Sequence, residues 1–99
     1  MLFRSGSIDV QGNAGDWVGY YMCGGSINVH GNAGYLVGWE MSNGVIRIGD
    51  RIEGVPGQYM SGGEIYIDGG KAFRLPESAT GGDIYYKGKL KMSDGGRVR

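Results

Sequence analysis

The sequence holds a single cysteine, Cys23, and a single histidine, His30. One cysteine excludes a framework of internal disulfides and is typical of a protein from a reducing compartment. One histidine and one cysteine also cannot build a zinc site of ordinary His and Cys ligands within one chain. We therefore expect no metal site in this chain, and we interpret Cys23 as a small structural residue rather than a catalytic nucleophile.

Net charge and long hydrophobic runs are absent too. Ten Lys and Arg residues balance ten Asp and Glu residues. The chain therefore lacks the positive potential that attracts nucleic acids and anionic membranes. No run approaches the roughly 18 apolar residues of a membrane span, and the amino terminus lacks the hydrophobic region of a signal peptide. We expect a cytoplasmic protein whose partners include neither nucleic acid nor a membrane.

Glycine, in contrast, is abundant, with 22 residues. A Walker phosphate loop needs Lys followed by Ser or Thr after its last glycine, and the sequence has no such dipeptide. A dinucleotide fingerprint needs a helix, which this sequence does not offer. Aromatic residues make up 11% of the chain, which argues against a disordered low-complexity segment. We expect a folded chain with no catalytic residues and no cofactor-binding residues of its own.

The glycines recur with a fixed period. Five of them lie 19 residues apart without insertion or deletion: Gly6, Gly25, Gly44, Gly63 and Gly82. An isoleucine follows each by two residues, at Ile8, Ile27, Ile46, Ile65 and Ile84. A short period without a helical pattern is typical of a chain that winds into stacked turns, each burying its apolar residues against the next. We predict an all-β fold, a parallel β-helix (solenoid) of about five 19-residue turns.

One domain over residues 1–99 is expected, because a chain of this length supports a single core. Its repeats would span residues 5–23, 24–42, 43–61, 62–80 and 81–99, and the last would act as a cap and a loose basic tail. Phe3 falls in phase with Met22, so the chain would begin within a turn. The first turn would then expose an unpaired edge, which is a candidate contact surface.

The second repeat indicates how one turn is built. Polar and apolar residues alternate from Ser26 to His30, which predicts a half-buried strand with Ile27 and Val29 inward and His30 facing solvent. Gly-Asn-Ala-Gly follows at residues 31–34 and predicts a corner. We predict a second strand over residues 35–41, ending in Met41. We assign Met41 to the core with Met22 and Met60, which stand at the same phase.

Charged residues replace the Gly-Asn-Ala-Gly corner in the third and fourth turns. In the third turn, Pro56 stands in phase with Val18 and Val37, and we expect it to shorten or displace the second strand because proline cannot donate to a ladder. The charged side chains are expected to gather on one side of the solenoid: Arg47, Asp50, Arg51, Glu53, Lys71, Arg74 and Glu77. They form either a solvated face that prevents sheet aggregation or a docking face for a partner subunit.

Aromatic residues are richer in the first three turns than a small domain requires, at Trp17, Tyr20, Tyr21, Tyr35, Trp39 and Tyr59. Such residues stabilise a solenoid by stacking, and an exposed stripe of them also fits an interface. Outward carboxylates at Asp9, Glu64 and Asp83 are near enough in phase to meet in space, but the pattern indicates no cleft around them.

The segments SGSIDVQGNAGDWVGYYMC and GGSINVHGNAGYLVGWEM resemble the Gly-x-x-Gly-x-x-x-Gly repeat superfamily. That superfamily includes the repeat-containing subunit of formylmethanofuran dehydrogenase and the carboxy-terminal domain of the glutamate synthase large subunit. Six structural glycines carry the resemblance: Gly12, Gly15, Gly19, Gly31, Gly34 and Gly38. The resemblance implies a right-handed β-helix that holds catalytic subunits or domains in relation to one another.

The resemblance also implies where the chemistry resides. The cofactors would sit in partner chains: a molybdenum or tungsten pterin with iron-sulfur clusters for the dehydrogenase, or a flavin with an iron-sulfur cluster for the synthase. We expect a non-catalytic structural or assembly subunit of an oxidoreductase complex, similar to the repeat-containing subunit of formylmethanofuran dehydrogenase. The alternatives are a glutamate-synthase-type domain and a free-standing module that oligomerises or binds a ligand. A homo-oligomer or a hetero-oligomer is expected in each case.

Overall fold

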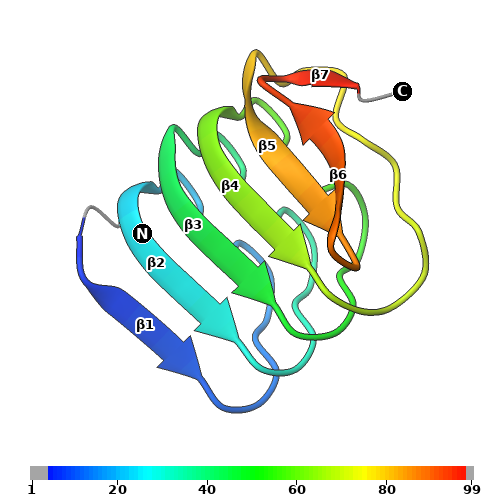
Figure 1. The fold of residues 1–99 in the computed structure, drawn as a ribbon. Helices are drawn as coiled ribbons and strands as arrows, with labels where there is room; N and C mark the ends of the chain where they lie inside the picture. Colours follow the sequence, from blue (N-terminus) through cyan, green and yellow to red (C-terminus); the bar gives the residue numbers. More distant parts are fainter. Residues whose placement is uncertain (1–4, 98–99) are drawn as a thin grey trace.

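The computed structural model describes residues 5–97, in which β-strands form one sheet and no helix occurs. The strands are β1 (Ser7–Val10), β2 (Cys23–Val29), β3 (Asn43–Ile48), β4 (Ser61–Ile67), β5 (Gly81–Tyr86), β6 (Lys89–Ser93) and β7 (Gly96–Arg97). Strands β1 to β5 pair in parallel and in sequence order, which makes a stacked β-solenoid of about four turns (Figure 1). The predicted all-β solenoid is confirmed. We call each 19-residue circuit a coil.

The register follows the sequence repeat. Ile8 pairs with Ile27, Ile27 with Ile46, Ile46 with Ile65 and Ile65 with Ile84. Side chains alternate across a strand, so these isoleucines all face inward, together with the in-phase ladder Val10, Val29, Ile48, Ile67 and Tyr86. The two ladders make one continuous core behind the sheet, as predicted.

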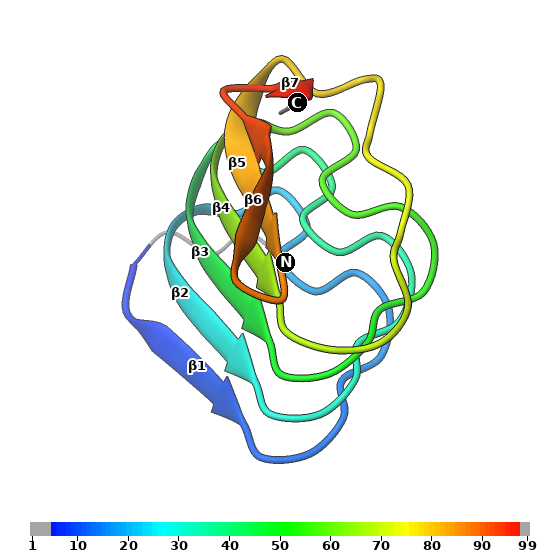
Figure 2. The ribbon, with the colours of Figure 1, turned by 45° about the vertical axis from the view of Figure 1, so that its right-hand side comes forward.

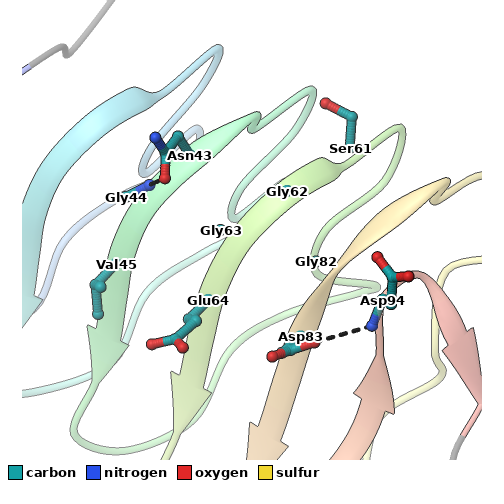
Figure 3. A pocket seen from close by; sticks show the side chains of 10 residues that line it. All are labelled: Asn43, Gly44, Val45, Ser61, Gly62, Gly63, Glu64, Gly82, Asp83 and Asp94. Carbon is teal, nitrogen blue, oxygen red and sulfur yellow. Dashed lines mark hydrogen bonds between the residues drawn. The ribbon is translucent and has the colours of Figure 1, made fainter.

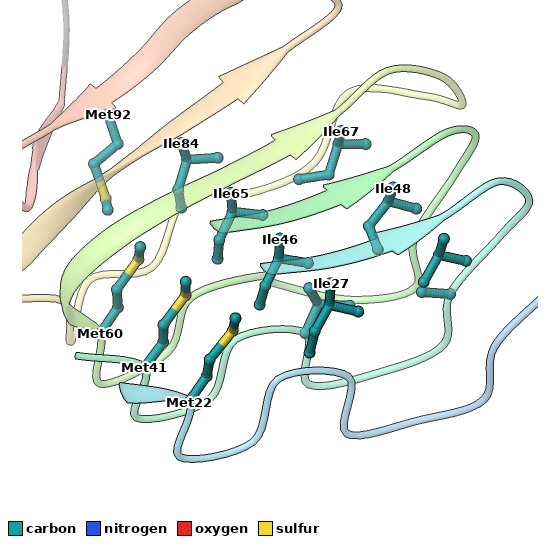
Figure 4. Packing of buried hydrophobic residues seen from close by; sticks show 13 residues of the cluster. Met22, Ile27, Met41, Ile46, Ile48, Met60, Ile65, Ile67, Ile84 and Met92 are labelled. Atoms are coloured by element: carbon teal, nitrogen blue, oxygen red, sulfur yellow. The ribbon is translucent and has the colours of Figure 1, made fainter. Parts of the chain in front are cut away.

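Methionines line the opposite wall of that core. Met22, Met41 and Met60 are completely buried, each one repeat from the next. Figure 4 shows them in one row facing the isoleucine row, with Met92 and Ile84 at the end of the stack. Each full burial of such a side chain contributes about 1.5–3 kcal/mol. Their assignment to the core is confirmed.

The second strand predicted over residues 35–41 does not exist. This segment is a turn with left-handed backbone at Leu36, Gly38 and Glu40, with φ of 65°, 72° and 53°. A strand cannot continue through such residues. Single hydrogen bonds still join neighbouring coils, because Gly38 donates to the Val18 carbonyl at 2.8 Å and Glu40 to the Gln58 carbonyl at 2.8 Å. These connections stack on the side away from the sheet (Figure 2).

Pro56 disturbs this arrangement less than its sequence predicts. There is no second strand for it to shorten, and its side chain is buried in the core. The bond to the preceding coil comes from the next residue, since Gly57 donates to the Val37 carbonyl at 2.7 Å. The expectation of a shortened strand is therefore wrong.

The fifth repeat does not form another coil. Lys87 and Gly88 both have positive φ, 48° and 82°, which is the geometry of a two-residue hairpin turn. The chain reverses there, and β6 pairs antiparallel with β5. The buried Met92 of β6 then covers the end of the core. The count of five turns is corrected to about four; Phe3 and the end of the basic tail, Val98 and Arg99, lie outside the described residues.

Candidate functional site

Asparagine side chains join the Gly-Asn-Ala-Gly corners of successive coils. The Asn13 Oδ1 atom accepts a hydrogen bond from the Asn32 backbone N–H at 2.8 Å, and the Asn32 Oδ1 atom accepts one from the Arg51 N–H at 3.1 Å. This contact brings the corners so close that a Cβ atom on Gly31 would overlap the Asn13 side chain. The φ of Gly31 is not positive, so backbone conformation does not require glycine there. The close approach of the neighbouring corner does.

The six glycines that carry the sequence resemblance fall into two groups. A Cβ atom on Gly34 would overlap the Asp16 side chain, and Gly19 and Gly38 adopt positive φ against isoleucine side chains of the core. Gly12 and Gly15, in contrast, have no atom within 4 Å of the Cβ position. They occupy the first coil, and no coil among the described residues lies beneath it.

Backbone groups of the first coil are open on this side. In the second coil, Gly31 and Gly34 donate to the carbonyls of the first coil at 3.0 Å each. The equivalent N–H groups of Gly12 and Gly15 find no acceptor within residues 5–97. Among residues 5–97, strand β1 is likewise an edge strand, paired on one side only by β2. An unpaired edge of this kind is a template for a further strand.

An apolar hollow adjoins these backbone groups. Val10, Ala14 and Val18 of the first coil are only partly buried, although Val29, Ala33 and Val37 at the same phase are buried. The hollow is lined by Val10, Ala14, Trp17, Val18, Gly19, Ile27 and Val29. We call the hollow and the adjoining edge of β1 the open first coil. The core reaches the surface here, whereas the β5–β6 hairpin covers its other end.

Aromatic rings pack against one another on the turns opposite the sheet. The rings of Tyr20 and Trp39 stack at 5.3 Å with an angle of 7° between their planes. Trp17, Tyr21 and Tyr59 pack edge to face against this pair, with centroids 4.4–6.1 Å apart. Trp17 and Tyr59 are nevertheless 48% and 55% exposed. We call these five residues and Glu40 the aromatic surface.

Glu40 gives this surface a negative charge. Its carboxylate beside the Tyr21 phenol, together with partial desolvation and the neighbouring Tyr20, raises the pKa of Tyr21 to about 12. Tyr21, Glu40 and Tyr59 are in phase and share left-handed backbone, with φ of 56°, 53° and 59°. For residues other than glycine this conformation costs about 1–2 kcal/mol each. The hydrogen bond from the Tyr59 N–H to the Ser78 Oγ atom at 2.9 Å is one of the contacts that hold it.

The outward carboxylates are engaged with neighbouring polar groups. Asp9 contacts His30 Nε2 at 2.8 Å and accepts hydrogen bonds from Asn28 at 3.2 Å and Gln11 at 2.5 Å. His30 is exposed, as predicted. These contacts join β1 to β2 across the polar face of the sheet.

Glu64 and Asp83 are neighbours in the register of β4 and β5. They line an open groove where the strands begin, and Figure 3 shows Asp83 accepting a hydrogen bond from the Asp94 N–H at 2.9 Å. Glu64 accepts a hydrogen bond from the Tyr66 phenol at 2.9 Å. Within residues 5–97, no three His, Cys, Asp or Glu side chains gather in a way that fits a metal ion.

The charged residues predicted as an interface divide among three places. Arg47 lies on the sheet face, 3.2 Å from Asp68 and 4.4 Å above the Tyr66 ring. Arg51 contacts Glu53 at 3.7 Å on the corner after β3, next to Asp50. Lys71, Arg74 and Glu77 belong to the connection between β4 and β5, where Arg74 and Glu77 line a groove with Tyr59. The structure therefore pairs Arg51 with Glu53 but separates both from Arg47.

A comparison with protein-family models found no match, and neither did comparisons with curated proteins and with solved structures. In the described part of the chain, no helix is long and apolar enough to cross a membrane.

Proposed function

We propose that this chain is a non-catalytic assembly module that binds a partner protein through its open first coil. The observation that carries the proposal is the contrast between the two ends of the core. One end is covered by Met92 and the β5–β6 hairpin. The other presents partly exposed Val10, Ala14 and Val18 beside a strand edge that no segment of residues 5–97 pairs with. An apolar patch that adjoins unpaired backbone groups is typical of a surface that another chain covers.

The nature of the partner rests on the resemblance of the glycine repeat. The repeat-containing subunit of formylmethanofuran dehydrogenase is the preferred analogue, so the module would position catalytic subunits of a cytoplasmic oxidoreductase complex. Those subunits would carry the molybdenum or tungsten pterin, iron-sulfur cluster or flavin. The same resemblance supports a right-handed solenoid, as does the near-universal right-handedness of parallel crossovers. A glutamate-synthase-type domain and a free-standing oligomer are the alternatives.

Affinity purification from the native cell extract, followed by mass spectrometry, tests the proposal. A co-purifying subunit with a pterin or iron-sulfur site supports the dehydrogenase type, and one with a synthase flavin site supports the glutamate synthase type. A homo-oligomer without a companion supports the free-standing module. A monomer that retains no other protein contradicts the proposal.

Two variants connect the result to the open first coil. Val18→Lys places a charge in the hollow and should reduce capture of the partner at least tenfold, because a buried unpaired charge is costly. Ala72→Lys adds the same charge at an exposed position on the far connection and serves as the control. Equal capture by both variants would exclude the hollow as the binding surface.

A further inference from the structure

The net charge of zero conceals two regions of opposite sign. Between Ser5 and Ile46 the side chains charged at neutral pH are all acidic: Asp9, Asp16 and Glu40. The segment from Ile84 to the end of the chain carries five basic residues and one acidic residue: Lys87, Lys89, Lys91, Arg97, Arg99 and Asp94. The first two coils are therefore acidic, and the carboxy-terminal hairpin is basic.

The basic region presents lysines that have no acidic partner in the described part of the chain. Lys87, Lys89 and Lys91 are exposed at the turn between β5 and β6 and along β6. The Lys and Arg ion pairs among the described residues join Arg47 to Asp68 and Arg51 to Glu53, and so include none of these lysines. We call the three lysines the lysine hairpin.

The aromatic surface combines a carboxylate with exposed aromatic rings, which are groups that bind an ammonium group. Glu40 supplies a carboxylate that no Lys or Arg side chain of the described residues pairs with. Trp17 and Tyr59 present exposed rings on either side of the Tyr20–Trp39 pair. The face of an aromatic ring attracts a cation electrostatically, and an adjacent carboxylate adds to this attraction.

The same chain already uses this combination on its sheet face. The Arg47 guanidinium lies 4.4 Å from the centre of the Tyr66 ring and 3.2 Å from the Asp68 carboxylate. Lys87 Nζ also lies 5.4 Å from the centre of the Tyr86 ring. This chain therefore already contains a cation that contacts both an aromatic ring and a carboxylate.

We propose that the lysine hairpin of one copy docks on the aromatic surface of a second copy. The aromatic surface belongs to the turns of the first three coils, and the hairpin to the opposite end of the sheet (Figures 1 and 2). The contact is therefore heterologous, head to tail, and repeats into rings or short filaments. It shares Trp17 with the lining of the open first coil but centres on Glu40 and Tyr59 of the next two coils, so it stands if the proposed binding of a partner at the open first coil fails.

Light scattering of the purified chain at low and high salt is the first measurement. At about 0.01 M salt the average mass should rise above the 10.6 kDa of one chain as the protein concentration increases. At about 1 M salt, screening should reduce the association constant at least tenfold. A mass of one chain at every concentration and both salts would overturn the proposal.

A charge exchange then identifies the surfaces. The first variant carries Glu40→Lys, and the second carries Lys89→Glu with Lys91→Glu. Each variant alone repels itself and should stay monomeric, whereas an equimolar mixture restores opposite charges at both contacts and should associate. Asp50→Lys, at an exposed position on the corner after β3, is the control and should associate like the unaltered chain.

The outcomes separate this contact from the open first coil. A mixture that stays monomeric overturns the proposal, provided that circular dichroism shows both variants folded. Self-association of the separate variants at the level of the unaltered chain also overturns it. Val10→Lys, which alters the open first coil at the end of β1 and leaves Trp17 unchanged, should not affect this association.

Discussion

Gly12 and Gly31 are at the same phase of the repeat but differ in their surroundings. Gly31 packs on the first coil, whereas no described residue lies against the Cβ position of Gly12. Gly31→Ala should destabilise the chain by about 1–3 kcal/mol, since the added Cβ atom would overlap Asn13 and the Gly12 carbonyl. Gly12→Ala adds the same atom into open space at a φ that is not left-handed. It should change the free energy of unfolding by about 0.4–1 kcal/mol in the stabilising direction, through the unfolded chain.

Urea denaturation of both variants measures the difference. Both variants replace glycine by alanine, so each is the control for the other. The intrinsic conformational preference of alanine then cancels when the two free energies of unfolding are compared. Equal destabilisation of both would mean that a coil covers Gly12 in solution, for example one from another chain.

A hydrogen bond to Glu64 is the largest of several causes that raise the pKa of Tyr66. The Glu64 carboxylate accepts it, and together these causes raise the pKa of Tyr66 from 10.0 to about 12. The folded state thus favours the neutral phenol, and the resulting stabilisation is complete below about pH 10 and lost as the pH rises from about 10 to about 12. Glu64→Gln should return the Tyr66 pKa toward 10 and remove this part of the pH dependence.

Tyrosine resonances followed by NMR between pH 8 and 13 would measure this pKa. Glu77→Gln, at an exposed carboxylate away from Tyr66, should leave it unchanged. An unchanged pKa in Glu64→Gln would instead assign the shift to the Tyr85 ring stacked 4.4 Å away.

Elements differ in how well the sequence predicts them. Alternation of polar and apolar residues predicts a strand over residues 26–30. The structure has it as part of β2 (Cys23–Val29) and buries Ile27 and Val29 as expected. The second strand was wrong because Leu36 and Glu40 adopt left-handed backbone, which their side chains do not favour. Hydrogen bonds from neighbouring coils hold that conformation, and such contacts are not local in sequence. The in-phase Gly19, Gly38 and Gly57 were the available signal, since all three have positive φ.

The β5–β6 turn gives a prediction for one element. Both of its residues need positive φ, and lysine is a poor residue for the first of them. Lys87→Asn should stabilise the chain by about 0.5–1 kcal/mol, because asparagine tolerates this conformation. Gly88→Val should destabilise it by at least about 1–2 kcal/mol for the opposite reason.

Urea denaturation of these two variants tests whether the hairpin folds with the solenoid. Lys91→Asn, on β6 but outside the turn, controls for loss of the lysine charge. If Gly88→Val unfolds like the unaltered chain, the hairpin is not part of the cooperative unit.

At the scale of the whole molecule, the period predicted the sheet order and register but not the candidate surfaces. The aromatic surface joins Trp17, Trp39 and Tyr59 from three coils, and their proximity follows from the stacking rather than from any local pattern. The sequence grouped the charges of Arg47 and Arg51, yet strand alternation sends Arg47 to the sheet face and the corner carries Arg51 elsewhere. Phase predicts which residues stack, whereas the direction of long side chains depends on their partners.

A solenoid whose coils contact only their neighbours should tolerate another coil. Inserting a second copy of residues 24–42 after Ser42 keeps the period, so each new residue meets its equivalents above and below. Stability in such folds is approximately a sum of repeat and interface terms. We expect the free energy of unfolding to rise, and the urea m-value to rise by about a quarter as the surface exposed on unfolding grows.

The control is the same insert shortened by one residue, which shifts every following side chain to the opposite face of its strand. It should lower the free energy of unfolding even though it adds nearly the same apolar surface. If both inserts stabilise equally, added hydrophobic surface explains the effect and the period does not. The full-length insert leaves the sequences of the first and last coils unaltered. If it lowers the free energy of unfolding, stability depends on the total number of coils and is not a sum of repeat and interface terms.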